Sequence, residues 1–118
     1  MKQTSDRRSV CPVACTLDLI GDKWSLLIVR DLFAGKTSFK ELTDSPEHIA
    51  TNILTDRLNR LCESGIVARA ATDAHAGRFQ YTLTKTGKTL FPVLKSVADW
   101  GLKYLPGTAA NVRVRRGK

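Results

Sequence analysis

Residues 38–65 read SFKELTDSPEHIATNILTDRLNRLCESG and predict two helices separated by a short turn. Ser38 and Glu41 have the spacing of a capping box, in which each side chain accepts a backbone N–H of the other, so a short helix begins here. Pro46 ends this helix, because the residue before a proline disfavours the helical backbone. Leucines at three- and four-residue steps then predict a longer helix over residues 51–64.

The helix expected over residues 51–64 is amphipathic, and Gly65 supplies its C-terminal cap. Its apolar stripe consists of Leu54, Leu58, Leu61 and Cys62, with Ile53 at the margin. At about 100° per residue, the opposite side gathers short polar side chains. We name this side the recognition face; it comprises Thr51, Asn52, Thr55, Asp56 and Asn59.

The chemistry of the recognition face suits the edges of DNA bases. Asparagine bonds adenine through two hydrogen bonds, threonine contacts the thymine methyl group, and aspartate accepts a hydrogen bond from cytosine N4. The alternative interpretation is an ordinary solvated helix face. The segments on either side of this helix therefore decide between the two interpretations.

The flanking segments complete a recognisable order of elements. Two helices are expected before residue 38, over about residues 12–20 and 23–34. Alternating apolar residues after Gly65 predict two antiparallel strands, joined by a loop around residues 73–77. A last helix is expected from Thr84 or Thr86 to about Tyr104, with a kink at Pro92. The expected fold class is α+β and mostly helical: a winged helix-turn-helix, with additional helices at both ends of the chain.

The charge of the chain favours a polyanionic partner. Its net charge is +8 and its isoelectric point is about 9.8. Residues 57–110 carry eight basic and three acidic side chains, and the segment NVRVRRGK at 111–118 adds four basic ones. Residues 11–56, by contrast, carry four basic and seven acidic side chains. The later half is therefore the expected phosphate-facing side.

The hairpin and the start of the short helix are the expected sites of backbone contacts. His75 and Arg78 lie at the hairpin loop, from which they can follow the phosphates or enter the minor groove. A helix N-terminus also favours an anion. The residues expected to hold phosphates there are Lys36, Thr37, Ser38 and Lys40. A single arginine in a hairpin loop is usually just solvated, so this interpretation depends on the whole arrangement.

Composition bounds the other classes of protein. The 118 residues are enough for one domain with its own core, expected at 11–106 between a flexible basic N-terminus at 1–10 and a disordered basic tail at 107–118. The sequence contains no apolar run long enough to span a membrane and no signal-peptide pattern, so a cytoplasmic location is expected. The three cysteines are then expected to be reduced thiols.

The sequence offers little for catalysis. His48 and His75 are the only histidines, and neither has the spacing of a metal site or a catalytic triad. Glycine-rich phosphate loops and Cys-x-x-Cys motifs are absent from the sequence. We therefore expect no enzyme activity, no metal and no cofactor. A winged-helix module that binds another protein, without sequence-specific DNA binding, remains the alternative function.

Three separated motifs resemble the HxlR-type winged-helix transcriptional regulators of bacteria. They are CPVACTLDLIGDKWSLLIVRDLFAGKTSFKEL at 11–42, ILTDRLNRLCESGIVAR at 53–69 and YTLTKTGKTLFPVLKSVADWG at 81–101. The resemblance implies a homodimer, joined through its N- and C-terminal helices, on an inverted-repeat operator in double-stranded DNA. It also implies that an apolar stripe meets the first helix of the partner subunit: Leu90, Leu94, Val97 and Trp100. The alternative is that this stripe packs within its own chain.

The chain departs from the pattern of that family at three places. Members of the family commonly carry Gly-Gly-Lys-Trp, and Asp22 replaces the second glycine of this motif here. Ala50 replaces the usual serine before the recognition helix. Loss of that cap is expected to weaken the helix by about 1 kcal/mol. Ala76 and Gly77 stand where the family often has paired prolines, which predicts a more mobile hairpin loop.

Cys11 is the candidate for a regulatory site. Pro12 suits the first position of a helix, which makes Cys11 the N-cap residue. The positive end of the helix, together with Arg7 and Arg8, is expected to lower the pKa of this thiol and raise its reactivity. Some members of the resembling family respond to oxidants or electrophiles, so the hypothesis is a switch operated by a small oxidant or electrophile. The alternative is a small side chain that fills the dimer interface.

Overall fold

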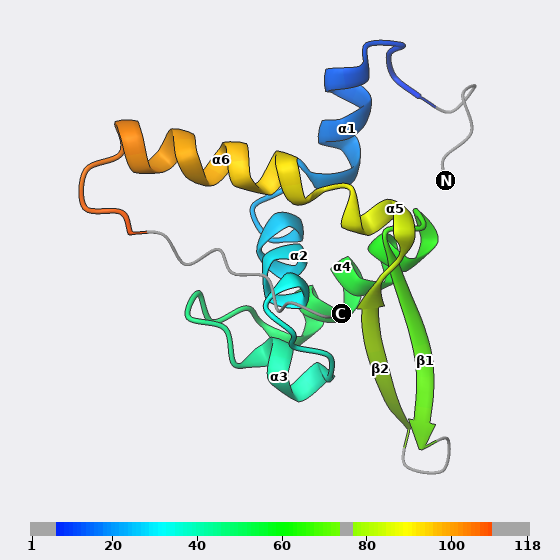
Figure 1. Ribbon diagram of the computed structural model, residues 1–118. Coiled ribbons are helices and arrows are strands. Elements are labelled where there is room, and N and C mark those ends of the chain that lie inside the picture. Colours follow the sequence, from blue (N-terminus) through cyan, green and yellow to red (C-terminus); the bar gives the residue numbers. More distant parts are fainter. Residues whose placement is uncertain (1–6, 74–76, 110–118) are drawn as a thin grey trace.

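The computed structural model describes residues 7–73 and 77–109, which form helices around a central α2 and one β-hairpin (Figure 1). The elements are α1 (Pro12–Ile20), α2 (Ser25–Phe33), α3 (Phe39–Thr43), α4 (Thr51–Glu63), β1 (Val67–Asp73), β2 (Arg78–Leu83), α5 (Lys85–Lys88) and α6 (Phe91–Tyr104). The predicted class, a mostly helical α+β winged helix-turn-helix, is confirmed by this order of elements.

The core lies between α2, α3, α4 and the base of the hairpin. Its least exposed side chains, all below 2% of their surface, are Val29, Leu42, Leu54, Leu58 and Leu61. Three of them are the leucines of the stripe that the sequence predicts on α4. Gly65 follows α4 with φ of +80°, a backbone conformation that glycine adopts without steric cost, so its predicted role as a helix stop is confirmed.

Arg30 of α2 fastens the turn between α3 and α4. Its guanidinium donates to both carboxylate oxygens of Glu47, each at 2.7 Å, and to Ser45 Oγ at 3.1 Å. The guanidinium also lies 3.0 Å from the buried carboxylate of Asp31. The hydrogen bonds from Arg30 lower the pKa of Glu47 to about 2. A bidentate ion pair between Arg30 and Glu47 thus holds the turn on α2.

The hairpin is attached to the start of α3. The backbone N–H of Tyr81 in β2 donates to the carbonyl of Thr37 at 2.8 Å, and Gln80 forms a bridge with Ser38. The sequence pattern places Ile66 and Ala68 on the inner face of the first strand. In the structure Ile66 and Val67 are both buried, whereas Ala68 and the rest of β1 are exposed, so burial does not alternate along this strand.

The expected single helix after the hairpin is two helices, so the prediction of one helix kinked at Pro92 is wrong. Thr84 caps α5, where its hydroxyl accepts the N–H of Gly87 at 3.0 Å. Pro92 is the second residue of α6, not an interior one. The first amides of a helix have no partner within it, so a proline there starts a helix at no cost in hydrogen bonds.

The first turns of α6 pack on α2, where the rings of Phe33 and Phe91 meet edge to face at 5.4 Å and Leu94 is buried. The rest of α6 extends past the body of the protein, and α1 stands at the same end, opposite the hairpin tip (Figure 1). In the part of the chain that the structure describes, each helix is too short or too polar to cross a membrane.

The Arg30 contacts give a prediction for stability. Arg30→Met leaves the carboxylate of Asp31, with its side chain only 8% exposed, without its cation. We expect the free energy of unfolding to fall by about 3 kcal/mol, as measured by urea denaturation at pH 7. Lys95→Met is the matched control, because the Lys95–Asp99 pair is more than half exposed, and we expect a change below about 0.5 kcal/mol. Equal losses in the two variants would contradict the assignment.

Candidate nucleic-acid interface

The polar side of α4 faces outward. All five residues of the recognition face are exposed, while the leucines on the other side of the helix are buried. The structure therefore brings together the residues that the sequence predicted as one surface. This surface can present amide, hydroxyl and carboxylate groups to a ligand that lies along the helix.

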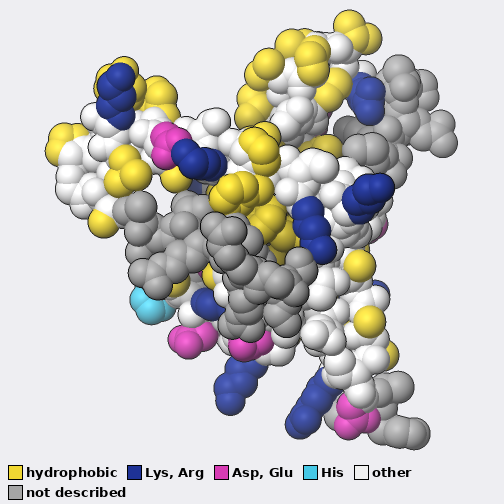
Figure 2. Space-filling model, viewed as in Figure 1, with side chains coloured by type: hydrophobic (Ala, Val, Ile, Leu, Met, Phe, Trp, Pro, Cys, Tyr) yellow, Lys and Arg dark blue, Asp and Glu magenta, His cyan; other side chains and the backbone are white. Residues whose placement is uncertain are grey.

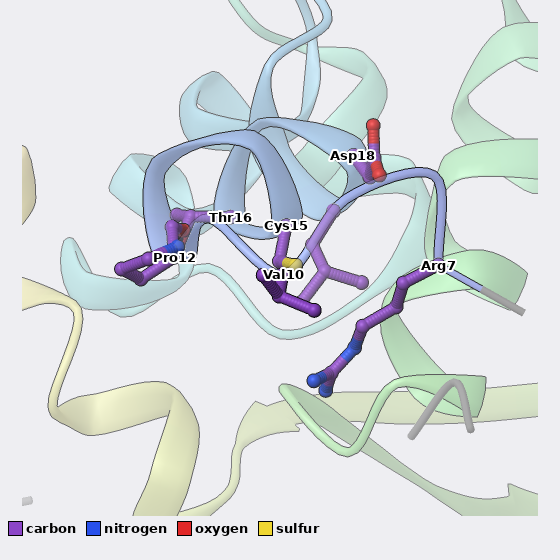
Figure 3. Close-up of a pocket in the computed structure, with 7 residues that line it drawn as sticks. Arg7, Val10, Pro12, Cys15, Thr16 and Asp18 are labelled. Carbon is purple, nitrogen blue, oxygen red and sulfur yellow. Dashed lines mark hydrogen bonds between the residues drawn. The ribbon is translucent and has the colours of Figure 1, made fainter. Parts of the chain in front are cut away.

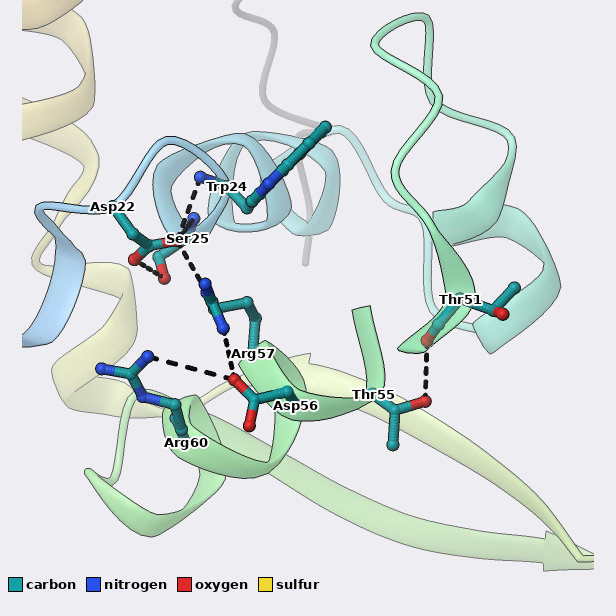
Figure 4. Close-up of polar contacts among 8 residues, drawn as sticks. All are labelled: Asp22, Trp24, Ser25, Thr51, Thr55, Asp56, Arg57 and Arg60. Atoms are coloured by element: carbon teal, nitrogen blue, oxygen red, sulfur yellow. Dashed lines mark hydrogen bonds and ion pairs between the residues drawn. The ribbon is translucent and has the colours of Figure 1, made fainter. Parts of the chain in front are cut away.

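The start of α4 lacks a side-chain cap. Ala50 occupies the N-cap position in an extended conformation and its side chain offers no acceptor, as the sequence predicted. One turn later, the hydroxyl of Thr55 donates to the carbonyl of Thr51 at 2.9 Å (Figure 4). The proton of this hydroxyl is thus used within the helix, which leaves the methyl group and the oxygen lone pairs of Thr55 for a ligand.

Asp56 is paired with two arginines of its own helix. Its Oδ2 accepts a hydrogen bond from Arg57, and Arg60 Nη1 lies 4.0 Å from the same oxygen (Figure 4). The expectation of a free acceptor for cytosine did not include these partners. Asp56 can still accept through its other oxygen, but its negative charge is largely compensated.

Arg57 also reaches across to the loop before α2. Its Nε donates to Asp22 Oδ2 at 2.9 Å, and the same oxygen accepts the backbone N–H groups of Trp24 and Ser25 (Figure 4). Burial alone would raise the pKa of Asp22, but the hydrogen bonds from Ser25, Arg57 and Trp24 lower it to about 2. Sequence reasoning missed this pair; the only signal was the presence of Asp22 at a position where the family often has glycine.

The start of α3 differs from the expectation of an anion site. The capping box is formed, with the Glu41 N–H donating to Ser38 Oγ at 3.0 Å. Glu41 Oε1 accepts the backbone N–H groups of Thr37 at 3.0 Å and Ser38 at 3.1 Å, and the bond from Thr37 lowers the pKa of Glu41. These two amides therefore already have an anionic partner, so a DNA phosphate would have to displace Glu41 to bind them.

The two lysines near α3 differ in burial and in the contacts that they make within the protein. Lys36 is half-buried and its Nζ donates to the carbonyl of Asp44 at 2.9 Å. Lys40 is exposed on α3. Of the two, Lys40 is the better placed to meet a phosphate without giving up a contact.

The hairpin extends from the end of the molecule that also carries α3. Arg78 is exposed at the first position of β2, while His75 lies outside the described residues. Arg69 lies over the ring of Phe79, 4.9 Å from its centroid, on the exposed part of the hairpin. Lys and Arg side chains project from the edge between α3 and the hairpin tip (Figure 2). Asp and Glu side chains lie beside them on the same edge (Figure 2), so the basic groups that can meet a polyanion are individual side chains that project from a mixed surface.

The thiols lie at the other end of the molecule, apart from Cys62, which belongs to α4. Cys11 is exposed and is the N-cap residue of α1, as predicted. Cys15 lines a cavity of about 290 Å³, together with Arg7 and Val10 among other residues (Figure 3). The Cys15 thiol donates to the carbonyl of Ser9. Cys62 is half-buried, and burial raises the pKa of its thiol.

Side chains that can bind metal ions are scattered over residues 7–73 and 77–109. Within these ranges, no three His, Cys, Asp or Glu side chains lie in an arrangement that suits a metal ion.

Comparison with known proteins identifies the relatives of this chain. A family model of HxlR-like helix-turn-helix proteins matches residues 19–109. The uncharacterised HTH-type transcriptional regulator YdeP of Bacillus subtilis is 37% identical over 101 residues, which are 86% of this chain and 79% of YdeP.

Solved structures of transcriptional regulators also resemble this chain. PA1607, a candidate transcription factor, superposes with a TM-score of 0.79 at 41% identity, over 98% of this chain and 81% of that one. The redox regulator HypR in its reduced form superposes with a TM-score of 0.72 at 33% identity, over 79% of this chain and 92% of that one.

Proposed function

The chain belongs to the HxlR-like helix-turn-helix family of transcriptional regulators, and we propose that it binds an inverted-repeat operator in double-stranded DNA as a homodimer. The exposed recognition face of α4 is the observation that carries this proposal. Proteins of this family regulate transcription and are not enzymes, so the function of this chain lies in what it binds.

The recognition face has the size and chemistry for the major groove of DNA. The groove is about 12 Å wide and admits one α-helix, whose outward side chains meet the base edges. Asn52 and Asn59 have exposed side-chain amides that suit adenine, and Thr55 offers its methyl group to thymine. Lys40 and Arg78 are then assigned to the phosphates or, for Arg78, to the minor groove.

Two groups of variants separate base recognition from backbone contact. Asn52→Ala and Thr55→Ala should each reduce discrimination at one base pair by about 1–3 kcal/mol, because they remove contacts to base edges. Arg78→Ala should weaken binding to all sequences alike and make the salt dependence shallower. Selection of bound duplexes from a random pool, followed by titration at several salt concentrations, measures both effects.

Thr86→Ala, an exposed change on α5 outside the recognition face and the proposed dimer interface, is the control for these variants and should leave both properties unchanged. The assignment of the recognition face fails if Asn52→Ala and Thr55→Ala keep the sequence preference of the parent protein. Binding that does not weaken as salt rises would favour the alternative, a module that binds another protein.

The homodimer is proposed from the hydrophobic side chains that the two terminal segments leave uncovered. Among the described residues, Phe79 is the one exposed large hydrophobic side chain that lies away from α1, α6 and the residues directly beside these two helices. The others are Val10, Val13, Leu17, Val93, Val97, Trp100, Leu102, Tyr104 and Leu105. They gather over α1 and over the free end of α6 (Figure 2). A concentration of this kind marks an interaction site, and a second copy supplies the same surface in return.

The stripe that the family resemblance assigned to the partner divides into two parts. Leu94 is only 5% exposed and Leu90 is half-buried, so these two pack within their own chain. Val97 is 54% exposed and Trp100 is 59% exposed. We assign Val97 and Trp100 to the interface between subunits.

Charge on α6 should therefore separate the subunits. Val97→Asp combined with Trp100→Glu removes two central apolar contacts and places like charges there, so we expect the dimer dissociation constant to rise at least about 100-fold. Sedimentation equilibrium measures it. Phe79→Lys is the control, because it places a charge at another exposed hydrophobic residue, 38% exposed, on the hairpin and should leave the dimer intact. An unchanged dimer in the α6 variant would refute the assignment.

We infer that Cys11 makes DNA binding responsive to electrophiles. It is exposed on α1, the helix that also carries Val13 and Leu17 of the proposed interface. The proposed reaction is addition of the Cys11 thiol to an activated alkene: the sulfur forms a bond to the β-carbon, and the thiol proton ends on the neighbouring carbon. The resulting thioether adds bulk at the interface. HypR is itself a redox regulator, which supports a role for thiol chemistry here.

Treatment with N-ethylmaleimide, an activated alkene, tests this inference. We expect the operator affinity of the parent protein to change at least about fivefold, which corresponds to about 1 kcal/mol. Cys11→Ser should abolish the response, whereas Cys15→Ser should keep it. An unchanged response in Cys11→Ser would refute the inference. Measurement is by fluorescence anisotropy with a labelled operator duplex.

A further inference from the structure

We propose that Asp22 is a positioning residue for DNA recognition, because it holds the guanidinium of Arg57 on the protein and away from the DNA phosphates (Figure 4). The inference rests on the proposed DNA binding and adds a residue outside the helix-turn-helix to it. Asp22 precedes α2, and Arg57 lies in the middle of α4.

The carboxylate of Asp22 is itself held in place by the start of α2. Its Oδ2 accepts the backbone N–H groups of Trp24 at 3.0 Å and Ser25 at 3.1 Å, and its Oδ1 accepts the hydroxyl of Ser25 at 2.5 Å. Ser25 is 2% exposed. Both oxygens are thus fixed by groups that cannot move without disturbing the core.

Arg57 is drawn onto this fixed carboxylate. Its Nε donates to Asp22 at 2.9 Å, and the other end of its guanidinium contacts Asp56. The side chain of Arg57 is 20% exposed, whereas that of Arg60, one turn further along α4, is 51% exposed. Of the two arginines, Arg57 is the one withdrawn from solvent.

The withdrawal matters because Arg57 follows Asp56 of the recognition face directly. An arginine beside that face has the length and the planar donors to bind a phosphate. Such a contact adds affinity for every DNA sequence and no discrimination between sequences. By capturing Arg57, Asp22 keeps this sequence-independent affinity low, and with it the share of the binding free energy that comes from the phosphates.

Asp22→Asn tests the role of the charge. Asparagine keeps a side-chain oxygen that can accept the amides at the start of α2, so the local fold is retained while the ion pair is weakened. We expect binding to a scrambled duplex to become tighter, with a slope of log K against log salt steeper by about 0.9 per protomer. The affinities for the operator and for the scrambled duplex should rise by the same factor and leave their ratio unchanged, because a phosphate contact adds the same free energy on every sequence.

Two further variants assign the effect to Arg57. Arg57→Met should keep the salt slope of the parent protein, because Arg57 does not contact phosphate there. Asp22→Asn combined with Arg57→Met should also keep it, since the released cation is gone. A shallower slope in Arg57→Met, or a steeper one in the double variant, overturns the proposal.

The remaining outcomes also decide the matter. If Asp22→Asn lowers the urea midpoint but leaves the salt slope and the affinity for the scrambled duplex unchanged, Asp22 has only a structural role and the proposal is wrong. If the parent protein binds operator and scrambled duplexes equally, the proposed function fails. The change of slope between the parent and Asp22→Asn on the same duplex still tests the inference in that case.

Discussion

The burial of one stripe of leucines on α4 is the constraint on which the rest of the structure depends. Leu54, Leu58 and Leu61 are at most 1% exposed, and each contributes roughly 2–3 kcal/mol by leaving water. A rotation of α4 about its axis would expose them, so the rotation is fixed. The opposite side of the helix must then face outward, which is where the short polar side chains lie. Core packing and the exposure of the recognition face are two consequences of one arrangement.

Two arginine–carboxylate pairs refine the position that the leucines set. Arg30 of α2 holds Glu47 in the turn before α4, and Asp22 in the loop before α2 holds Arg57 within α4. Both pairs join the α2 region to the helix-turn-helix, at separate points along it. Because each has a cation in contact with more than one acceptor, neither partner can rotate freely. The side chains beside the recognition face therefore start from defined positions.

The two ends of the molecule divide the work between them. The hairpin and α3 carry basic side chains at one end, while α1 and α6 carry uncovered hydrophobic side chains at the other. The α6 helix can serve both the core and a partner because its faces differ. Leu94 is buried on α2, and Trp100 remains exposed beyond the edge of the body. A dimer joined at that end would present two copies of α4 at a fixed separation, as an inverted repeat requires.

The sequence alone determined what depends on near neighbours along the chain. The capping box of Ser38 and Glu41, the stop at Gly65 and the two sides of α4 follow from spacings of a few residues, because helix geometry repeats every 3.6 residues. Tertiary structure decided the contacts between distant segments: Asp22 meets Arg57 across 35 residues, and Thr37 meets Tyr81 of the hairpin. It also decided that Pro92 starts a helix. A long polar side chain can choose among many partners, and only the packed fold brings one of them within hydrogen-bond distance.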